Sequence, residues 1–278
     1  MGAFAAIGGR PDATICFACD RVLGDARVRR QHQHILVTGG SSGFGRHFAR
    51  FLASNGAKVT LAARSAEALA AAVDGINEAG GKAQSAVLDV TVAEKIDAAM
   101  AEAEAKFGPI HAVVNNAGVT ATKPALDQDE RAWDSVIDTN LKGVWLVAQA
   151  TAKRVVANKV KGSVVNIASI LGLRVAGAVA PYAISKAGVI QMTKALALEW
   201  ARYGIRVNAL APGYFATELN DDFFESERGQ ALIKRVPQRR LGQLSELDGP
   251  LLLLISNAGS FMTGSVVAVD GGHLVSGL

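Results

Sequence analysis

Seven short runs of apolar and β-branched residues alternate with longer, alanine-rich segments from residue 35 almost to the end of the 278-residue chain. Such continuous apolar runs predict strands buried on both faces, as in a parallel sheet covered by helices. Parallel strands need long crossover connections, and the alanine-rich segments have the length of helices. The predicted fold class is therefore α/β, a single-domain doubly wound Rossmann fold of about seven parallel strands with helices on both faces.

The predicted strands are residues 35–37, 59–62, 83–88, 112–114, 163–167, 206–210 and 266–269. The predicted helices are residues 45–55, 66–79, 92–107, 130–158 with a break, 183–203 and 245–256. Gly108 and Gly204 stand where helices should end, and Asp127 with Glu130 has the spacing of a capping box. The polar segment 214–240 interrupts this regularity and is predicted to form a lid over a substrate cleft.

Residues 1–34 have no periodic pattern, so we expect a flexible extension ahead of one Rossmann-type domain over residues 35–278. Its single Cys-x-x-Cys pair, Cys16 and Cys19, lacks the histidine spacing of a usual zinc finger, and two reduced thiols are the favoured interpretation. No apolar stretch approaches the roughly 20 residues of a membrane span, and no basic targeting segment is recognised. We expect a cytoplasmic protein that binds neither membranes nor nucleic acid, because its net charge of +4 is spread along the chain.

A glycine-rich turn joins the first predicted strand directly to a helix, over Thr38-Gly39-Gly40-Ser41-Ser42-Gly43-Phe44-Gly45. Glycines let the backbone approach a pyrophosphate, and the helix N-terminus offers free N–H groups and positive potential to the anion. The turn therefore predicts a dinucleotide site. Its candidate residues are Gly39, Ser41, Ser42, Gly43, Phe44 and Gly45.

The Thr-Gly-x-x-x-Gly-x-Gly spacing resembles the cofactor motif of the short-chain dehydrogenase/reductase family, and the resemblance extends over residues 35–278. Further motifs of that family follow in order: Asp89-Val90, Asn115-Asn116-Ala117-Gly118, Asn140, Ser169, Tyr182-Ala-Ile-Ser-Lys186 and Pro212-Gly213. The resemblance implies that the adenine lies between Asp89 and Val90. It also places Asn116 and Gly118 on the ribose side, and Pro212, Gly213, Phe215 and Thr217 in the cofactor site, the last two at the nicotinamide end. Asn115 is expected to brace strands instead.

The turn after the second predicted strand, Ala62-Ala63-Arg64-Ser65, lacks the acidic residue that binds the ribose 2′-hydroxyl of NAD. Arg64 and Ser65 can instead bind a 2′-phosphate through charge-assisted and neutral hydrogen bonds. We therefore expect NADP(H) to be favoured over NAD(H). An arginine that simply faces water is the alternative.

Tyr182 and Lys186 are four residues apart, so their side chains share one face of a helix. A neighbouring ammonium stabilises a phenolate, and this predicts that Lys186 lowers the pKa of Tyr182 toward neutrality. Ser169 lies 13 residues earlier, at the exit of the fifth strand, where an open α/β sheet binds its ligand. Asn140 resembles the family asparagine that holds a water connecting the lysine to solvent, with a helix-kink hydrogen bond as the alternative.

These residues predict an oxidoreductase that moves a hydride between the nicotinamide and an alcohol or carbonyl group. Ser169 and Tyr182 would bind the substrate oxygen, and Tyr182 would act as general acid or base. Lys186 would also hold the nicotinamide ribose, and no metal is required. By resemblance the enzyme is expected to be a homotetramer.

The segment 170–181 is apolar apart from Arg174, which predicts a largely apolar substrate. A 3-oxoacyl thioester is the first alternative, with Arg174, Lys159 or Lys161 meeting its phosphate groups. Sugar and steroid substrates are further alternatives, and the sequence does not choose among them. A catalytically silent dinucleotide-binding sensor is a more remote one, because such proteins usually lose the tyrosine or the lysine.

Overall fold

The structure is a computed structural model that describes residues 33–217 and 221–276. Cys16, Cys19 and all but the last two residues of the predicted extension lie outside the described residues. Within the described ranges, no helix is long and apolar enough to cross a membrane.

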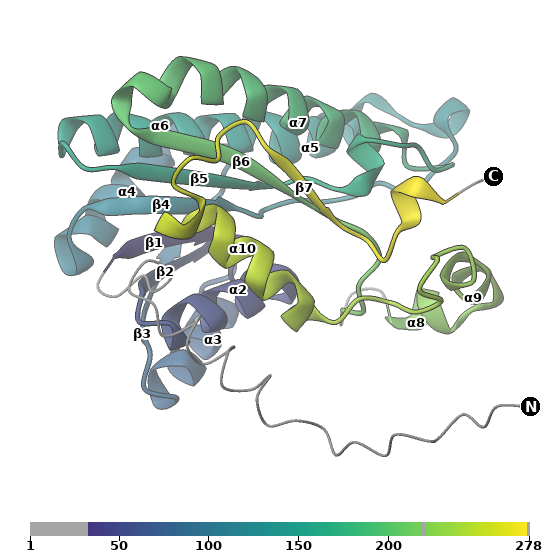
Figure 1. Cartoon of the computed structure of the whole chain (residues 1–278), viewed down its shortest axis with the longest axis horizontal. Helices are drawn as coiled ribbons and strands as arrows, with labels where there is room; N and C mark the ends of the chain where they lie inside the picture. Colours follow the sequence, from purple (N-terminus) through teal and green to yellow (C-terminus); the bar gives the residue numbers. More distant parts are fainter. Residues whose placement is uncertain (1–32, 218–220, 277–278) are drawn as a thin grey trace, which may run out of the picture.

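The described chain forms one seven-stranded parallel sheet with helices on both faces, in the strand order β3-β2-β1-β4-β5-β6-β7 (Figure 1). This confirms the predicted fold class. The strands are β1 His34–Thr38, β2 Lys58–Ala63, β3 Lys82–Val87, β4 Ile110–Asn115, β5 Gly162–Ile167, β6 Ile205–Pro212 and β7 Val266–Val269. Each predicted strand lies within two residues of the observed bounds.

Alternate residues of each central strand face opposite layers of helices. Ile35 and Val37 pack toward one layer, while Leu36 between them packs toward the other, and all three side chains are buried. The first layer contains α2 Gly43–Ser54, α3 Ala66–Glu78 and α10 Asp248–Ile255. The second contains α4 Ala93–Phe107, α6 Gly143–Ala157 and α7 Ala180–Trp200. The shorter helices are α5 Glu130–Ile137, α8 Asp221–Glu225 and α9 Glu227–Ile233.

Two of the seven strands are not buried on both faces, and for these the prediction was wrong. β3 and β7 are the edges of the sheet, so each has a neighbouring strand on one side only. Val87 in β3 is 59% exposed, and no residue of β7 is fully buried. Composition does not distinguish an edge strand from a central one, because the position in the sheet depends on long-range pairing.

The predicted break in the segment 130–158 is a widened turn of a continuous helical path. A π-helical turn, Asp138–Lys142, joins α5 to α6. The predicted capping box is wrong, because the side chain of Asp129 caps α5 by accepting from the backbone N–H of Ala132 at 2.8 Å. Gly108 and Gly204 end their helices as predicted, both at positive φ.

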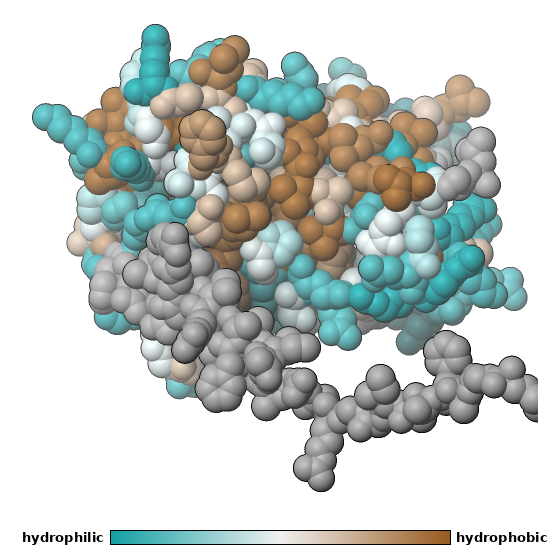
Figure 2. Space-filling model, in the orientation of Figure 1, coloured by the Kyte–Doolittle hydropathy of each residue, from teal (hydrophilic) through white to brown (hydrophobic). Residues whose placement is uncertain are grey.

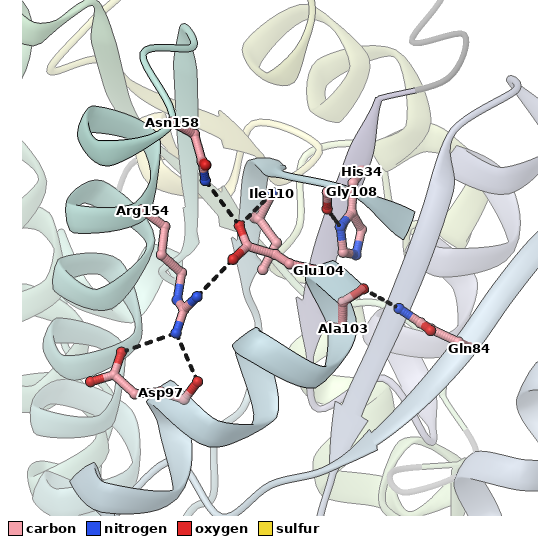
Figure 3. Close-up of polar contacts among 9 residues, drawn as sticks. All are labelled: His34, Gln84, Asp97, Ala103, Glu104, Gly108, Ile110, Arg154 and Asn158. Atoms are coloured by element: carbon pink, nitrogen blue, oxygen red, sulfur yellow. Dashed lines mark hydrogen bonds and ion pairs between the residues drawn. The ribbon is translucent and has the colours of Figure 1, made fainter. Parts of the chain in front are cut away.

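A polar cluster ties the second helical layer to the sheet at the edge where β4 begins (Figure 3). The carboxylate of Glu104 on α4 accepts from Nη1 of Arg154 on α6 at 2.6 Å and from the backbone N–H of Ile110 at 2.9 Å. Arg154 also donates to the backbone carbonyl of Asp97 at 2.7 Å. The cluster therefore fixes the distance between α4, α6 and the start of β4.

Candidate active site

The predicted site residues gather at the edge of the sheet where the parallel strands end. The glycine-rich turn follows β1, Asn116 and Gly118 follow β4, and Ser169 follows β5. Strands in a parallel sheet all end at the same edge, which brings these distant residues together. Pro212 ends β6 at that edge as well.

Tyr182 and Lys186 lie in the first half of α7, opposite the end of β5. The amine of Lys186 is buried, 5.6 Å from the centre of the Tyr182 ring, and donates to the carbonyl oxygen of Ile167 at 2.8 Å. The hydroxyl of Ser169 is hydrogen-bonded to the phenol of Tyr182. Ser169 also accepts from the backbone N–H of Leu171 at 3.1 Å, which fixes its rotamer.

The pKa values at this site depend mainly on burial. Burial lowers the pKa of Lys186 to about 8. Burial also raises the pKa of Tyr182, and the bond from Ser169 opposes that change only in part. In the protein without bound cofactor, the prediction that Lys186 lowers the pKa of Tyr182 toward neutrality is therefore wrong. The same removal of water that favours a neutral lysine also favours a neutral phenol.

Asn140 lies in the π-helical turn and is fully buried. Its side-chain oxygen accepts from the backbone N–H of Val119 at 2.7 Å, and its amide donates to the carbonyl of Val119 at 2.8 Å and to the hydroxyl of Ser185 at 3.2 Å. The side chain therefore ties the chain after β4 to α7. These bonds are structural, but they run to other elements and therefore differ from the helix-kink bond that was the alternative.

Hydrogen bonds around Thr38 fix the glycine-rich turn to the chain that follows β4. The sequence assigned Thr38 no role beyond its place in the motif. The hydroxyl of Thr38 accepts from the backbone N–H groups of Asn116 and Ala117 at 3.0 and 3.1 Å. The amide of Asn116 donates to the carbonyls of Thr38 and Gly39 at 3.1 and 3.3 Å. A Cβ at Gly45 would lie 2.1 Å from the carbonyl oxygen of Gly39, so only glycine allows this approach.

The N-terminus of α2, directly after the glycine-rich turn, is open. A Cβ at Gly43, the first residue of α2, would meet nothing within 4 Å, and no side chain caps the N-terminus of that helix. Ser41 and Gly43 line, with Thr217, a groove of about 590 Å³. The helix N-terminus is thus accessible to an anion.

The adenosine end of the predicted site contains an exposed cation. Arg64 follows β2 and is exposed, and Ser65 caps α3 by accepting from the backbone N–H of Ala68 at 3.3 Å. The carboxylate of Asp89 accepts from the backbone N–H and the hydroxyl of Thr91, at 3.0 and 2.7 Å. These bonds, with the positive charge of Arg64 as a smaller cause, lower the pKa of Asp89. Arg64 therefore faces an anion of the protein itself.

The structure separates the remaining predicted cofactor residues into two kinds. Gly118 faces the catalytic centre, because a Cβ there would lie 3.7 Å from the amine of Lys186. Val90 and Phe215 are buried, and the ring of Phe215 packs edge-on against Phe44 at 5.7 Å. Gly213 packs close to the backbone of Asp270.

Asn115 braces strands, as expected, and donates to the side-chain oxygen of Asn166 on β5 at 2.9 Å. Lys159 and Lys161, by contrast, are not near Ser169. They precede β5 whereas Ser169 follows it, so they lie at the opposite edge of the sheet. Lys159 and Lys161 are close to Ser169 in the sequence, but the length of β5 separates them from it in space.

Tyr214 and His273 were not predicted as site residues, although Tyr214 directly follows Pro212-Gly213.

A phosphate-binding turn beside a buried Ser-Tyr-Lys group defines an NAD(P)-dependent oxidoreductase that acts on CH–OH groups. Comparison with known proteins agrees with this class. A family profile described as enoyl-(acyl carrier protein) reductase matches residues 39–273. The chain belongs to the short-chain dehydrogenase/reductase family.

Several relatives act on sugar acids by name. The chain is 40% identical to gluconate 5-dehydrogenase of Gluconobacter oxydans over 242 residues, which cover 87% of this chain and 94% of the relative. It is 38% identical to a 3-oxoacyl-[acyl-carrier-protein] reductase of Chlamydia muridarum, over 85% of this chain and 95% of the relative. The crystal structure of a gluconate 5-dehydrogenase from Burkholderia cenocepacia, in complex with NADP and tartrate, superposes with a TM-score of 0.86 at 37% identity. That likeness covers 90% of this chain and 98% of the other.

Proposed function

We propose that the chain transfers a hydride between NADP(H) and the carbonyl or alcohol group of a small molecule, with Tyr182 as general acid or base. One observation carries the proposal: the hydroxyl of Ser169 is bonded to the phenol of Tyr182 next to the buried amine of Lys186. The group lies at the same edge of the sheet as the glycine-rich turn, which would hold the pyrophosphate.

Each of these side chains has a distinct task. A bound nicotinamide supplies or accepts the hydride. Ser169 and Tyr182 hold the substrate oxygen, and in reduction Tyr182 donates its proton to that oxygen. Burial raises the pKa of Tyr182, which keeps the phenol protonated and ready to donate. Lys186 also binds the nicotinamide ribose. We further propose that Lys186 returns the proton with the help of a water held at Asn140.

The preference for NADP(H) over NAD(H) rests on Arg64. Its exposed guanidinium follows β2, where a 2′-phosphate would lie, and Ser65 offers a hydroxyl next to it. Asp89 opposes this preference, because its carboxylate lies close enough to attract Arg64. The other predicted contacts, through Ser42, Val90, Asn116, Gly118, Pro212, Gly213, Phe215 and Thr217, belong to the same proposal.

Two observations bear on the kind of substrate. Leu173 and Val175, next to the catalytic serine, are 49% and 83% exposed, which supports the apolar substrate predicted from the sequence. The names of the relatives instead concern gluconate, galactitol and acyl-carrier thioesters. A 3-oxoacyl thioester is thus the second candidate. The substrate that fits both observations is a small alcohol or carbonyl compound.

We propose a homotetramer, as expected from the sequence. Trp133, Trp145, Ile184 and Leu198 leave exposed apolar surface on α5, α6 and α7, and Phe261 and Val275 do so near β7. Apolar residues also gather on the face where β7 and α10 lie (Figure 2). Two separate apolar surfaces suit two interfaces per subunit. A molar mass equal to that of one chain, measured by light scattering, would contradict the tetramer.

The cytoplasmic location stays a prediction.

The test compares Tyr182→Phe with the control Tyr203→Phe, which changes an exposed tyrosine in the 3₁₀ turn after α7. NADPH and NADH binding would be followed by fluorescence, and turnover on a panel of hydroxy acids, polyols, apolar ketones and 3-oxoacyl thioesters. We expect Tyr182→Phe to bind cofactor normally and to lose about 10²- to 10⁴-fold in kcat, while Tyr203→Phe stays active. Cofactor binding without turnover on any panel member would favour the silent sensor. Equal activity of the two variants would refute the role of Tyr182.

A further inference from the structure

A polar cluster of three residues lies beside the catalytic tyrosine and has no task in the mechanism above. Arg174 follows the 3₁₀ turn Ile170–Gly172, Tyr214 follows β6, and His273 begins the 3₁₀ turn His273–Val275 after β7. Nη1 of Arg174 donates to the carbonyl oxygen of His273, and the rings of Tyr214 and His273 are 5.3 Å apart. Three segments distant in sequence thus meet at one point.

The cluster extends to the catalytic centre through Tyr214. Tyr214 lies close enough to Tyr182 to disfavour ionisation of the catalytic phenol. The guanidinium of Arg174 favours the ionised form of Tyr214 and so opposes the effect of burial on its pKa. Tyr214 is therefore close to both the catalytic phenol and a positive charge.

The charge of Arg174 has no counter-ion in the described part of the chain. Its side chain is half-buried, and none of the carboxylates in residues 33–217 and 222–276 forms an ion pair with it. A guanidinium has five N–H donors in a planar fork, and the carbonyl of His273 occupies one of its two terminal nitrogens. The rest of the fork is available to an anion.

His273 supplies a second, independent sign of a ligand. The residue is 6% exposed, and its Nδ1 is buried with no hydrogen-bond partner among the described residues. Leaving a buried polar atom unpaired costs free energy, which a polar ligand group would recover. The unpaired imidazole nitrogen of His273 and the remaining donors of the Arg174 guanidinium suit a ligand with both a carboxylate and hydroxyl groups.

We propose that Arg174 binds the carboxylate of the substrate, and that the substrate is a small hydroxy or oxo carboxylic acid. The inference rests on the proposed function, because the reacting carbon would lie at Ser169 and Tyr182. A guanidinium binds a carboxylate through two parallel hydrogen bonds, which orients the acid as well as attracting it. Arg174 lies two residues beyond Gly172, which packs against the backbone of Lys186, so the anion and the reacting carbon would belong to the same short molecule. In an acyl-carrier thioester, the whole pantetheine arm separates the phosphate from the reacting carbonyl.

The test uses two substrates that differ only in the charged group, D-gluconate and D-glucitol, with NADP⁺ and NAD⁺ at saturation. The variants are Arg174→Gln, Arg174→Lys and the control Arg202→Gln, which changes an exposed arginine at the far end of α7. We expect the parent enzyme to prefer the acid. Arg174→Gln should lower kcat/KM for gluconate about 10- to 100-fold, mainly through KM, and that for glucitol less than about 3-fold. For gluconate, the kcat/KM of Arg174→Lys should lie between those of the parent and Arg174→Gln. The kcat/KM of Arg202→Gln should equal that of the parent.

Equal losses on both substrates would overturn the inference and would indicate that Arg174 only holds the C-terminal turn. Turnover of uncharged ketones or alcohols without any preference for the acid would also overturn it, while leaving the proposed function intact. If no panel member is turned over, gluconate binding to the cofactor complex of Tyr182→Phe decides the question by calorimetry. If adding Arg174→Gln to Tyr182→Phe abolishes gluconate binding, the inference is supported. If gluconate binds equally to both proteins, the inference is refuted.

Discussion

The ion pair between Glu104 and Arg154 offers a test of what holds the helical layer to the sheet, remote from the active site (Figure 3). The two side chains are 17% and 20% exposed, so the pair is largely removed from water. One carboxylate oxygen accepts from Arg154 and the other from the backbone N–H of Ile110. Glutamine has the same shape but only one oxygen. In Glu104→Gln, an N–H donor must therefore face either Arg154 or Ile110.

The magnitude follows from the bonds that are lost and kept. A hydrogen bond to a charged group contributes about 1.5–3 kcal/mol, and Arg154 keeps its bond to the carbonyl of Asp97. We expect Glu104→Gln to lower the free energy of unfolding by about 2 kcal/mol, which corresponds to a Tm lower by roughly 4–8 °C for a domain of this size. The kcat should not change, because the cluster lies at the edge of the sheet opposite Ser169.

Urea unfolding at one fixed protein concentration would measure the difference, since assembly also affects apparent stability. The matched control is Glu102→Gln, which makes the same change at an exposed position on α4. We expect the control to lie within about 0.5 kcal/mol of the parent. If both variants unfold at the same urea concentration, the pair adds no net stability, as is common for exposed pairs, and the reasoning from burial is refuted.

Three further predictions concern the site itself. Gly45→Ala should abolish tight NADPH binding, because its Cβ would lie 2.1 Å from the carbonyl oxygen of Gly39; Gly75→Ala on α3, where the nearest atom is 3.9 Å away, should bind normally, and equal binding by fluorescence would contradict the close approach. Arg64→Ala should weaken NADPH binding at least tenfold more than NADH binding, whereas equal loss would mean that Arg64 does not contact a 2′-phosphate. The pKa of Lys186 is lowered to about 8, so between pH 8 and 10.5 the unfolded chain binds a proton that the folded chain has lost. The free energy of unfolding, relative to Lys186→Met, should therefore rise with pH across this window in urea titrations, and a constant difference would show that the buried amine stays protonated.

The strands, the helices and the order of the motifs were predictable from local sequence. Short apolar runs of three to six residues and alanine-rich segments indicate secondary structure directly, and the spacing of the glycines from 39 to 45 indicates a phosphate-binding turn. Ser169, Tyr182 and Lys186 followed from spacing together with resemblance. Their convergence at one edge of the sheet follows from parallel topology, which the alternation of strands and helices already required.

Other features depend on contacts between distant segments. The bonds of Asn140 to Val119 and Ser185, and of Thr38 to Asn116, join elements that local sequence does not relate. The raised pKa of Tyr182 is of the same kind, because its largest cause is burial, and burial results from packing.

The sequence by itself thus determined the class of fold and the chemistry at the catalytic residues, since both depend on short-range patterns. Only the tertiary structure decided which strands are edges, which lysines are near the substrate and what surrounds each ionisable group. It also brought Arg174, Tyr214 and His273 together across about 100 residues of chain. The physical reason is that electrostatics and burial depend on distance in space, and the sheet places residues by strand order instead of chain order.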